Sequence, residues 1–176
     1  MDLKLETALA NVETTYGELV NIANDFLSAT FTPIDELINQ INFRINALSI
    51  DQIRDYMLTL QLKAYGISEL KEKAALKAEL AEILQKEHFA ISFNGVDGSA
   101  AVKDKLATVA TSSETVTEAL YTLIASLLKT KLDAIHRLVD VLKSILMSRM
   151  QESKFMQLGS SNEIAPTTNG RITLNE

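Results

Sequence analysis

The chain has 176 residues, of which 47% are hydrophobic, and its formal net charge is −6. This length is enough for one ordinary domain core, and the acidic balance argues against a general nucleic-acid coat protein, which would normally be basic. The sequence contains no cysteine, which excludes disulfides and thiolate zinc sites and fits a reducing compartment. Aromatic residues make up only 6%, while Ala, Leu, Ile, Glu and Lys are abundant, so we expect an all-α protein.

Residues 1–90 are predicted to form an N-terminal layer of helices. Apolar residues recur at helical spacing over residues 3–28. Thr32 and Pro33 then match an N-cap followed by the first residue of a helix. This pattern predicts a break in the chain and a second helix over about residues 33–47.

The rest of this layer has further helix-start signals. Ser49 and Gln52 match a capping box, in which each side chain satisfies a backbone N–H group at the start of a helix. Gly66 marks the expected end, or a kink, of that third helix. A fourth helix follows, rich in Ala, Leu, Glu and Lys, with Glu69 and Lys73 spaced for an ion pair across one turn.

Two Asx-Gly pairs, Asn94-Gly95 and Asp97-Gly98, predict a turn or short hairpin over residues 91–99. Helical spacing resumes over residues 100–156, which we expect to form a long C-terminal helical region that mediates oligomerisation. Thr111-Ser112-Ser113-Glu114 matches another capping box, so the sequence leaves open whether this region is one helix or two. Residues 157–176 are rich in turn formers and are predicted to be a flexible tail.

Apolar residues cover far more than one stripe of the helix predicted around residues 120–150. One neighbouring helical hairpin does not easily cover so broad a face. We therefore expect burial on two sides, by the chain's own N-terminal helices and by a second copy in a ring or other homo-oligomer. The predicted oligomer interface consists of Leu128, Leu132, Ile135, Leu138, Val139, Leu142, Ile145 and Leu146.

The sequence has no pattern typical of catalytic or metal-binding residues. His88 and His136 fall on different predicted helices, and neither has a second ligand at metal-binding spacing. We therefore expect a non-enzymatic protein without a cofactor or metal. The N-terminus does not have the pattern of a signal peptide, and charged residues interrupt the longest apolar region, Leu120 to Met150. These features predict a cytoplasmic protein that does not enter a membrane.

The charge distribution is uneven along the chain. Residues 121–150 contain five basic residues (Lys129, Lys131, Arg137, Lys143 and Arg149) and two acidic ones (Asp133 and Asp140), a local charge of +3. A basic surface is therefore possible despite the acidic total, and phosphate groups would bind to it. The candidate DNA-contacting residues are Lys71, Lys73, Lys77, Arg137, Lys143 and Arg149.

Two segments resemble phage recombination mediators of the UvsY type. They are EKAALKAEL at residues 72–80 and LDAIHRLVDVLKSILMSRMQE at residues 132–152, together about a fifth of the chain. The resemblance implies a helical, ring-forming phage protein that binds single-stranded DNA and helps to load a recombinase in the host cytoplasm. The sequence departs from the family at Glu79, where the family has arginine, and at Leu138-Val139-Asp140, where it has Arg-Gly-Phe.

Two alternatives remain open. The expected architecture is similar to that of small terminase subunits, helical rings that act in DNA packaging and contact a packaging motor. The chain could instead be a purely structural viral or assembly protein that binds only protein partners. The local charge of residues 121–150 favours DNA, whereas the total charge of −6 and Glu79 favour protein partners.

Overall fold

The structure, a computed structural model, describes residues 3–161, and it describes side chains for residues 14 and 16–156. Within this range the protein consists of α1 (Leu3–Arg44), α2 (Ile50–Gly95), α3 (Ala100–Ala110) and α4 (Ser112–Ser161), with no strand. The predicted all-α class with a long C-terminal helix is confirmed. Most of the predicted tail lies outside the described residues, although α4 extends into it as far as Ser161. None of the described helices combines the length and the apolar character needed to cross a membrane.

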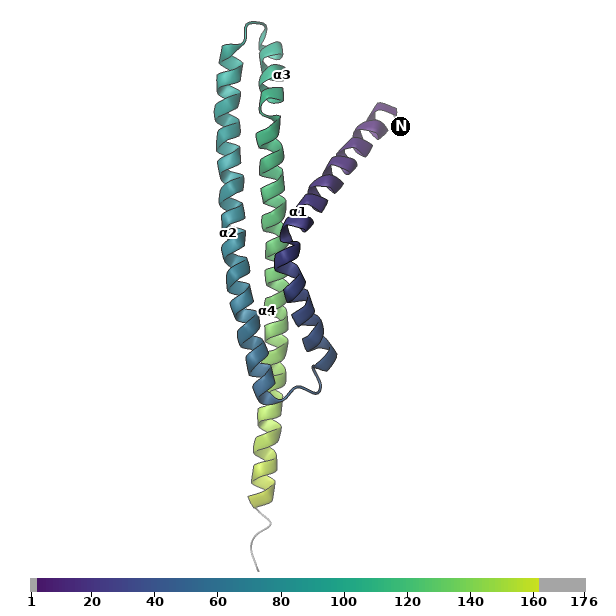
Figure 1. Cartoon of the computed structure of the whole chain (residues 1–176), viewed down its shortest axis with the longest axis vertical. Helices are drawn as coiled ribbons and strands as arrows, with labels where there is room; N and C mark the ends of the chain where they lie inside the picture. Colours follow the sequence, from purple (N-terminus) through teal and green to yellow (C-terminus); the bar gives the residue numbers. More distant parts are fainter. Residues whose placement is uncertain (1–2, 162–176) are drawn as a thin grey trace, which may run out of the picture.

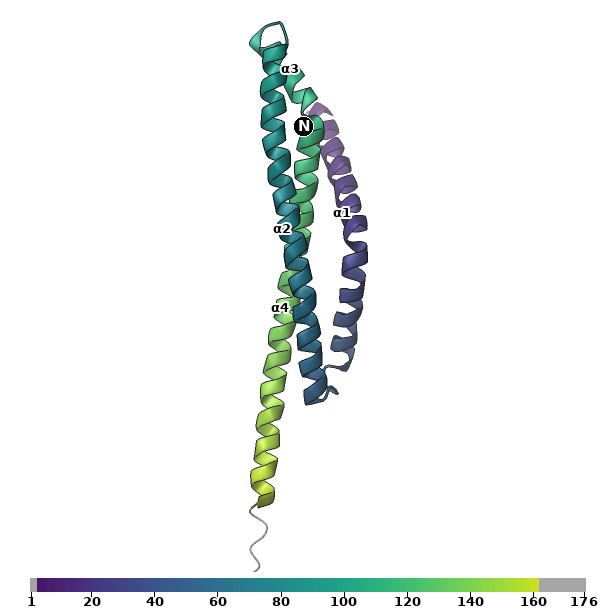
Figure 2. The ribbon, with the colours of Figure 1, turned by 60° about the vertical axis from the view of Figure 1, so that its left-hand side comes forward.

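The helices form an elongated hairpin with a third helix alongside one half of it. Figure 1 shows α2 and α4 running antiparallel, with α3 placed beyond the start of α4 and beside the end of α2. α1 packs mainly along α4, and its N-terminal part diverges from the hairpin. The C-terminal part of α4 extends past the loop that joins α1 to α2, as both views show (Figures 1 and 2). The molecule therefore has a three-helix half and a two-helix half.

A regular apolar seam holds α2 against α4. The buried residues of α2 include one residue in every seven, and Leu128, Ile135 and Leu142 of α4 have the same spacing. A seven-residue repeat keeps one stripe of a helix facing its neighbour, as in a coiled coil. The α2 residues on this stripe are Ile53, Leu60, Ile67, Ala74 and Ala81. Packing of this seam defines the long axis of the molecule.

α1 is continuous through Pro33, so the predicted break at Thr32 and Pro33 is wrong. Proline lacks an N–H group and removes one hydrogen bond from a helix interior, typically at a cost of about 3 kcal/mol. The buried residues Leu27, Ile34 and Ile41 are spaced by seven and stay in phase across the proline. Burial of this continuous stripe on the core offsets the lost hydrogen bond.

α2 begins as predicted and does not end where predicted. The Ser49 hydroxyl accepts a hydrogen bond from the Gln52 N–H group at 3.2 Å, and the Gln52 side chain accepts one from the Ser49 N–H group at 2.9 Å, which confirms the capping box. The helix then continues through Gly66 to Gly95, so the predicted end at Gly66 is wrong. Glycine costs only about 1 kcal/mol in a helix, and the buried side chains of Ala64 and Ile67 lie close to it in sequence.

The connection between α2 and α3 is shorter than the predicted turn over residues 91–99. The segment up to Gly95 is still helical, and only residues 96–99 form the connection. Phe89 and Phe93, one turn apart, stack with ring centroids 6.1 Å apart, and such pairs stabilise a helix. Gly98 has φ of 144°, a conformation that residues with a side chain rarely adopt, and it makes the turn.

Residues 100–161 form two helices separated at Thr111. Thr111 is buried, and its hydroxyl donates to the carbonyl oxygens of Ala107 and Thr108 at 3.1 and 3.3 Å. The predicted capping box needs this hydroxyl to accept a hydrogen bond from the next helix, and it does not do so. A threonine hydroxyl that bonds to the preceding turn competes with the helix and bends it, which accounts for the break.

Candidate interaction surfaces

The three basic residues predicted on α2 are all engaged within the chain. Lys71 Nζ lies 2.9 Å from Glu72 Oε1, and Lys73 Nζ lies 2.6 Å from Glu69 Oε1, which confirms the predicted ion pair. Lys77 Nζ donates to the Tyr121 hydroxyl at 3.3 Å and lies 4.9 Å from the centroid of its ring. The ammonium groups of Lys71 and Lys73 therefore each pair with a carboxylate, and that of Lys77 contacts a tyrosine.

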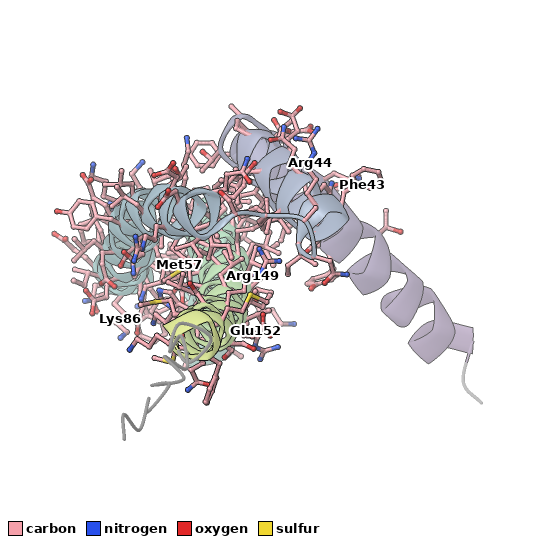
Figure 3. All side chains as sticks on the ribbon, turned by 90° about the horizontal axis from the view of Figure 1, so that it is seen from below. Phe43, Arg44, Met57, Lys86, Arg149 and Glu152 are labelled. Atoms are coloured by element: carbon pink, nitrogen blue, oxygen red, sulfur yellow. The ribbon has the colours of Figure 1, made fainter. Side chains whose placement is uncertain are left out.

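Two of the three basic residues predicted on α4 are also engaged. Lys143 Nζ lies 3.1 Å from Asp140 Oδ1. Arg149, labelled in Figure 3, donates from Nη2 to the carbonyl oxygens of Ile45 and Asn46 at 3.4 and 2.9 Å. These carbonyl groups follow the last residue of α1, so Arg149 acts as a structural tie between α4 and the α1–α2 loop. Among the described side chains, exposed Arg137 makes no ion pair.

The six predicted DNA-contacting residues do not form one patch. Lys77 contacts α4 at Tyr121, whereas Arg149 lies 28 residues further along the same helix. At 1.5 Å per residue, this separation is about 42 Å. Their spacing along the molecule therefore gives no compact basic site.

The predicted oligomer interface is largely the chain's own core. Leu128, Ile135, Val139 and Leu142 are buried within the single chain. The remaining four residues are partly buried and pack against the same core, namely Leu132, Leu138, Ile145 and Leu146. This corrects the inference that the broad face of α4 needs a second copy, because α2 and α1 of the same chain together cover it.

Lys131 fixes α1 on this face of α4. Its ammonium group lies 2.6 Å from Asp35 Oδ1 and 4.7 Å from the centroid of the Phe31 ring. The ammonium group is therefore held by a carboxylate and by the face of an aromatic ring from the same helix. A residue that contributes to the local positive charge of α4 is thus part of an interhelical contact.

The sequence reasoning missed an apolar surface on α2. Seven large apolar side chains of this helix are each between 55% and 77% exposed; we call this set the outer stripe, and its members are Leu58, Leu62, Tyr65, Leu76, Leu80, Ile83 and Ile91. Within residues 58–65 and again within residues 76–83 the spacing is three or four residues, a signal in the sequence that would have predicted exposed apolar groups on this helix. Single exposed apolar residues are common, but seven of them along one helix are typical of an interaction surface.

Two grooves lie next to this surface. One, of about 410 Å³, lies between α2 and α4 and is lined by Glu72, Glu79, Glu82 and Glu118 together with small and apolar side chains. The other, of about 300 Å³, lies between α1, α2 and α4, and its lining is mainly apolar with Lys73 and Lys77. The acidic groove would repel a phosphate backbone.

The titratable groups with altered pKa values are all in surface pairs. The hydrogen bond from Lys73 and its charge lower the pKa of Glu69. Hydrogen bonds from Ser113 and then from His88, whose Nδ1 lies 2.8 Å from Glu114 Oε1, lower the pKa of Glu114. The described side chains contain no group of three or more His, Cys, Asp or Glu residues able to hold a metal ion.

Comparison with known proteins gives no further identification. No family model matches the chain, and neither a curated protein nor a solved structure matches it significantly.

Proposed function

We propose that the protein is a non-enzymatic helical assembly component that acts through protein–protein contacts along its helices. The observation that carries this proposal is the outer stripe, a set of large apolar side chains on α2 that are more than half exposed to solvent. Leaving such a set uncovered is unfavourable, and a protein partner that covered it would contribute apolar burial.

The charges of the molecule support a protein partner over nucleic acid. The total charge is −6, and one groove beside the outer stripe is lined by four glutamates. Five of the six basic residues predicted to contact DNA have partners within the chain. These carboxylate, hydroxyl and carbonyl groups would compete with a phosphate for the same basic side chains.

A second candidate is an accessory role in DNA transactions, as a recombination mediator or a packaging subunit. The local charge of +3 over residues 121–150 favours it, together with Lys129 and Arg137, which are exposed and make no ion pair among the described side chains. These two residues are the basic groups on α4 best able to contact a phosphate.

Binding to a labelled single-stranded oligonucleotide, followed by fluorescence anisotropy at about 50 and 200 mM salt, tests the proposal. We expect no saturable, salt-sensitive binding. If binding appears, falls steeply with salt and is lost in the double variant Lys129→Glu, Arg137→Glu, the assembly proposal is overturned and the DNA role is favoured. Lys143→Glu is a matched control, because Lys143 is already paired with Asp140.

A further inference from the structure

We propose that the N-terminal segment of α1, residues 3–22, is a strap that closes onto the apolar side chains of α2 between Lys77 and Gly95. When closed, the strap would cover part of the outer stripe and exclude the protein partner that binds there. The inference rests on the proposed function, because it names a segment of this chain that regulates access to the same surface. Its evidence is the phase of the apolar residues on both helices and the length of the uncovered part of α2.

The rest of α1 shows where a closed strap would lie. Phe26 of α1 lines a groove with Lys73 and Lys77 of α2 and with residues of α4. α1 runs antiparallel to α2, so the residues before Phe26 lead toward the end of α2 at Gly95 (Figure 1). The N-terminal part of α1 nevertheless diverges from α2, and Tyr16 lines a different groove whose other residues all belong to α4. The strap is therefore open in the structure.

The side of α2 that lines the groove becomes more apolar further along the helix. The α2 residues of the groove include Lys73, Leu76 and Lys77. Residues spaced by seven lie on the same side of a packed helix. Seven positions after each of the three is an exposed apolar residue, and another follows after a further seven. These four residues are Leu80, Ile83, Leu84 and Ile91. A helix that continued along the groove would cover them.

The strap has an apolar face in phase with the packed part of α1. At 3.6 residues per turn, the apolar positions of this face fall within about 40° of the buried residue Ala23. They are Leu5, Leu9, Val12, Tyr16 and Leu19. The buried residues Ile34 and Ile41 fall in the same arc on the other side of Ala23. One apolar stripe therefore runs the length of α1, although only its later part is packed on α2 and α4.

The strap and the uncovered part of α2 have matching lengths. As α-helices, residues 3–22 span about 30 Å and residues 77–95 span about 28 Å. A closed strap would therefore reach the end of α2 and extend the three-helix half along the hairpin. Closure buries apolar groups of both segments, which favours it. A protein partner would offer the same kind of burial to α2, so the strap and the partner compete.

Disulfide formation tests closure, because the chain has no cysteine of its own. Leu27 and Lys73 line the groove together, so in antiparallel helices position 9 of a closed strap lies opposite position 91. We expect the double variant Leu9→Cys, Ile91→Cys to form a disulfide within one chain on mild oxidation, seen as a monomer of altered mobility on a non-reducing gel. A disulfide requires Cα atoms within about 7 Å, which the open strap does not provide.

The matched control is the double variant Leu9→Cys, Ala90→Cys. Ala90 is exposed and adjacent to Ile91, but it points about 100° away around α2. We expect its disulfide to form at least about tenfold more slowly, because its side chain does not face the closed strap. Absence of a disulfide within the chain at positions 9 and 91, or equal rates for the two pairs, overturns the proposal.

A blocking substitution tests the surface that receives the strap. Added to the Leu9→Cys, Ile91→Cys chain, Leu80→Glu should slow disulfide formation at least about tenfold, because closure would cover the new charge. Leu58→Glu is the matched control, since Leu58 is another exposed leucine of the outer stripe and lies 22 residues before Leu80. Equal rates in the two chains contradict closure onto this part of α2.

Binding of the apolar dye anilinonaphthalene sulfonate tests whether closure covers the outer stripe. We expect the oxidised Leu9→Cys, Ile91→Cys chain to give about half the dye fluorescence of the same chain after reduction, because fewer apolar groups remain exposed. Reduction of the disulfide returns the same protein to the open state, so each sample is its own control. Equal fluorescence in the two states overturns the proposal.

Failure of this inference can be distinguished from failure of the proposed function. A chain that forms no disulfide and does not bind DNA overturns the strap and leaves the assembly role in place. A chain that closes as expected and also binds single-stranded DNA in a salt-sensitive way supports closure and overturns the proposal of protein contacts alone.

Discussion

Shortening Leu142 to alanine should destabilise the protein strongly, because Leu142 is fully buried at the seam between the helices. The change removes three carbon groups, each worth about 0.8 kcal/mol of apolar burial, or roughly 2.4 kcal/mol together. The cavity left behind adds to this loss, and leucine-to-alanine changes in cores typically cost about 2–5 kcal/mol. We expect Leu142→Ala to lower the free energy of unfolding by about 3–4 kcal/mol.

Urea unfolding followed by circular dichroism at 222 nm measures this loss. The matched control is Val141→Ala, one residue away on the same helix, where the side chain is about half exposed. This control should change the free energy of unfolding by less than about 0.5 kcal/mol, since surface substitutions usually have small effects. A loss below about 1 kcal/mol for Leu142→Ala, or equal losses for the two variants, would show that α4 is not buried by its own chain.

Three further changes test other features. Gly66→Ala should raise the free energy of unfolding by about 0.5–1 kcal/mol in urea melts of the monomer, because a Cβ atom there meets no neighbour. Arg149→Met should speed hydrogen exchange of the α1–α2 loop, because it removes the donors to the carbonyl groups of Ile45 and Asn46; unchanged exchange would argue against the tie. Glu114 has a lowered pKa in the folded state, so its contribution is present above the usual glutamate pKa of 4.5 and is lost as the pH falls through the folded value. The fall in melting temperature on acidification should therefore be smaller in Glu114→Gln, and an identical fall would contradict this assignment.

The helices could be predicted from the sequence, but two of the breaks expected within them were wrong. The Ser49 capping box was recognised because it depends only on residues close together in the chain. Pro33 and Gly66 are predicted as breaks because both residues disfavour helix interiors locally. In the structure, buried residues spaced by seven remain in phase across both positions. The seven-residue spacing of apolar residues on both sides of Pro33 and Gly66 is visible in the sequence. Burial of these residues outweighed the local tendency of proline and glycine to end a helix.

The surfaces were harder to predict because they depend on which helices meet. The breadth of the apolar face of α4 was read correctly, but the sequence did not show that α1 and α2 cover it from two sides. The sequence likewise did not show which groups would pair with the basic residues predicted to contact DNA. Arg149 lies more than 100 positions in sequence from the carbonyl groups to which it donates, so no local pattern could have predicted that role.

The seam residues of α2 become smaller toward the C-terminal end of the helix. Ile53, Leu60 and Ile67 are large, whereas Ala74 and Ala81, further along the helix, are small. Burying an alanine methyl contributes about 0.8 kcal/mol, against about 1.5–3 kcal/mol for a leucine or isoleucine side chain. The large apolar residues in this later part of α2, Leu76, Leu80 and Ile83, are on the outer stripe instead. A protein partner that covered these residues would add apolar burial to the part of α2 that its own seam stabilises least.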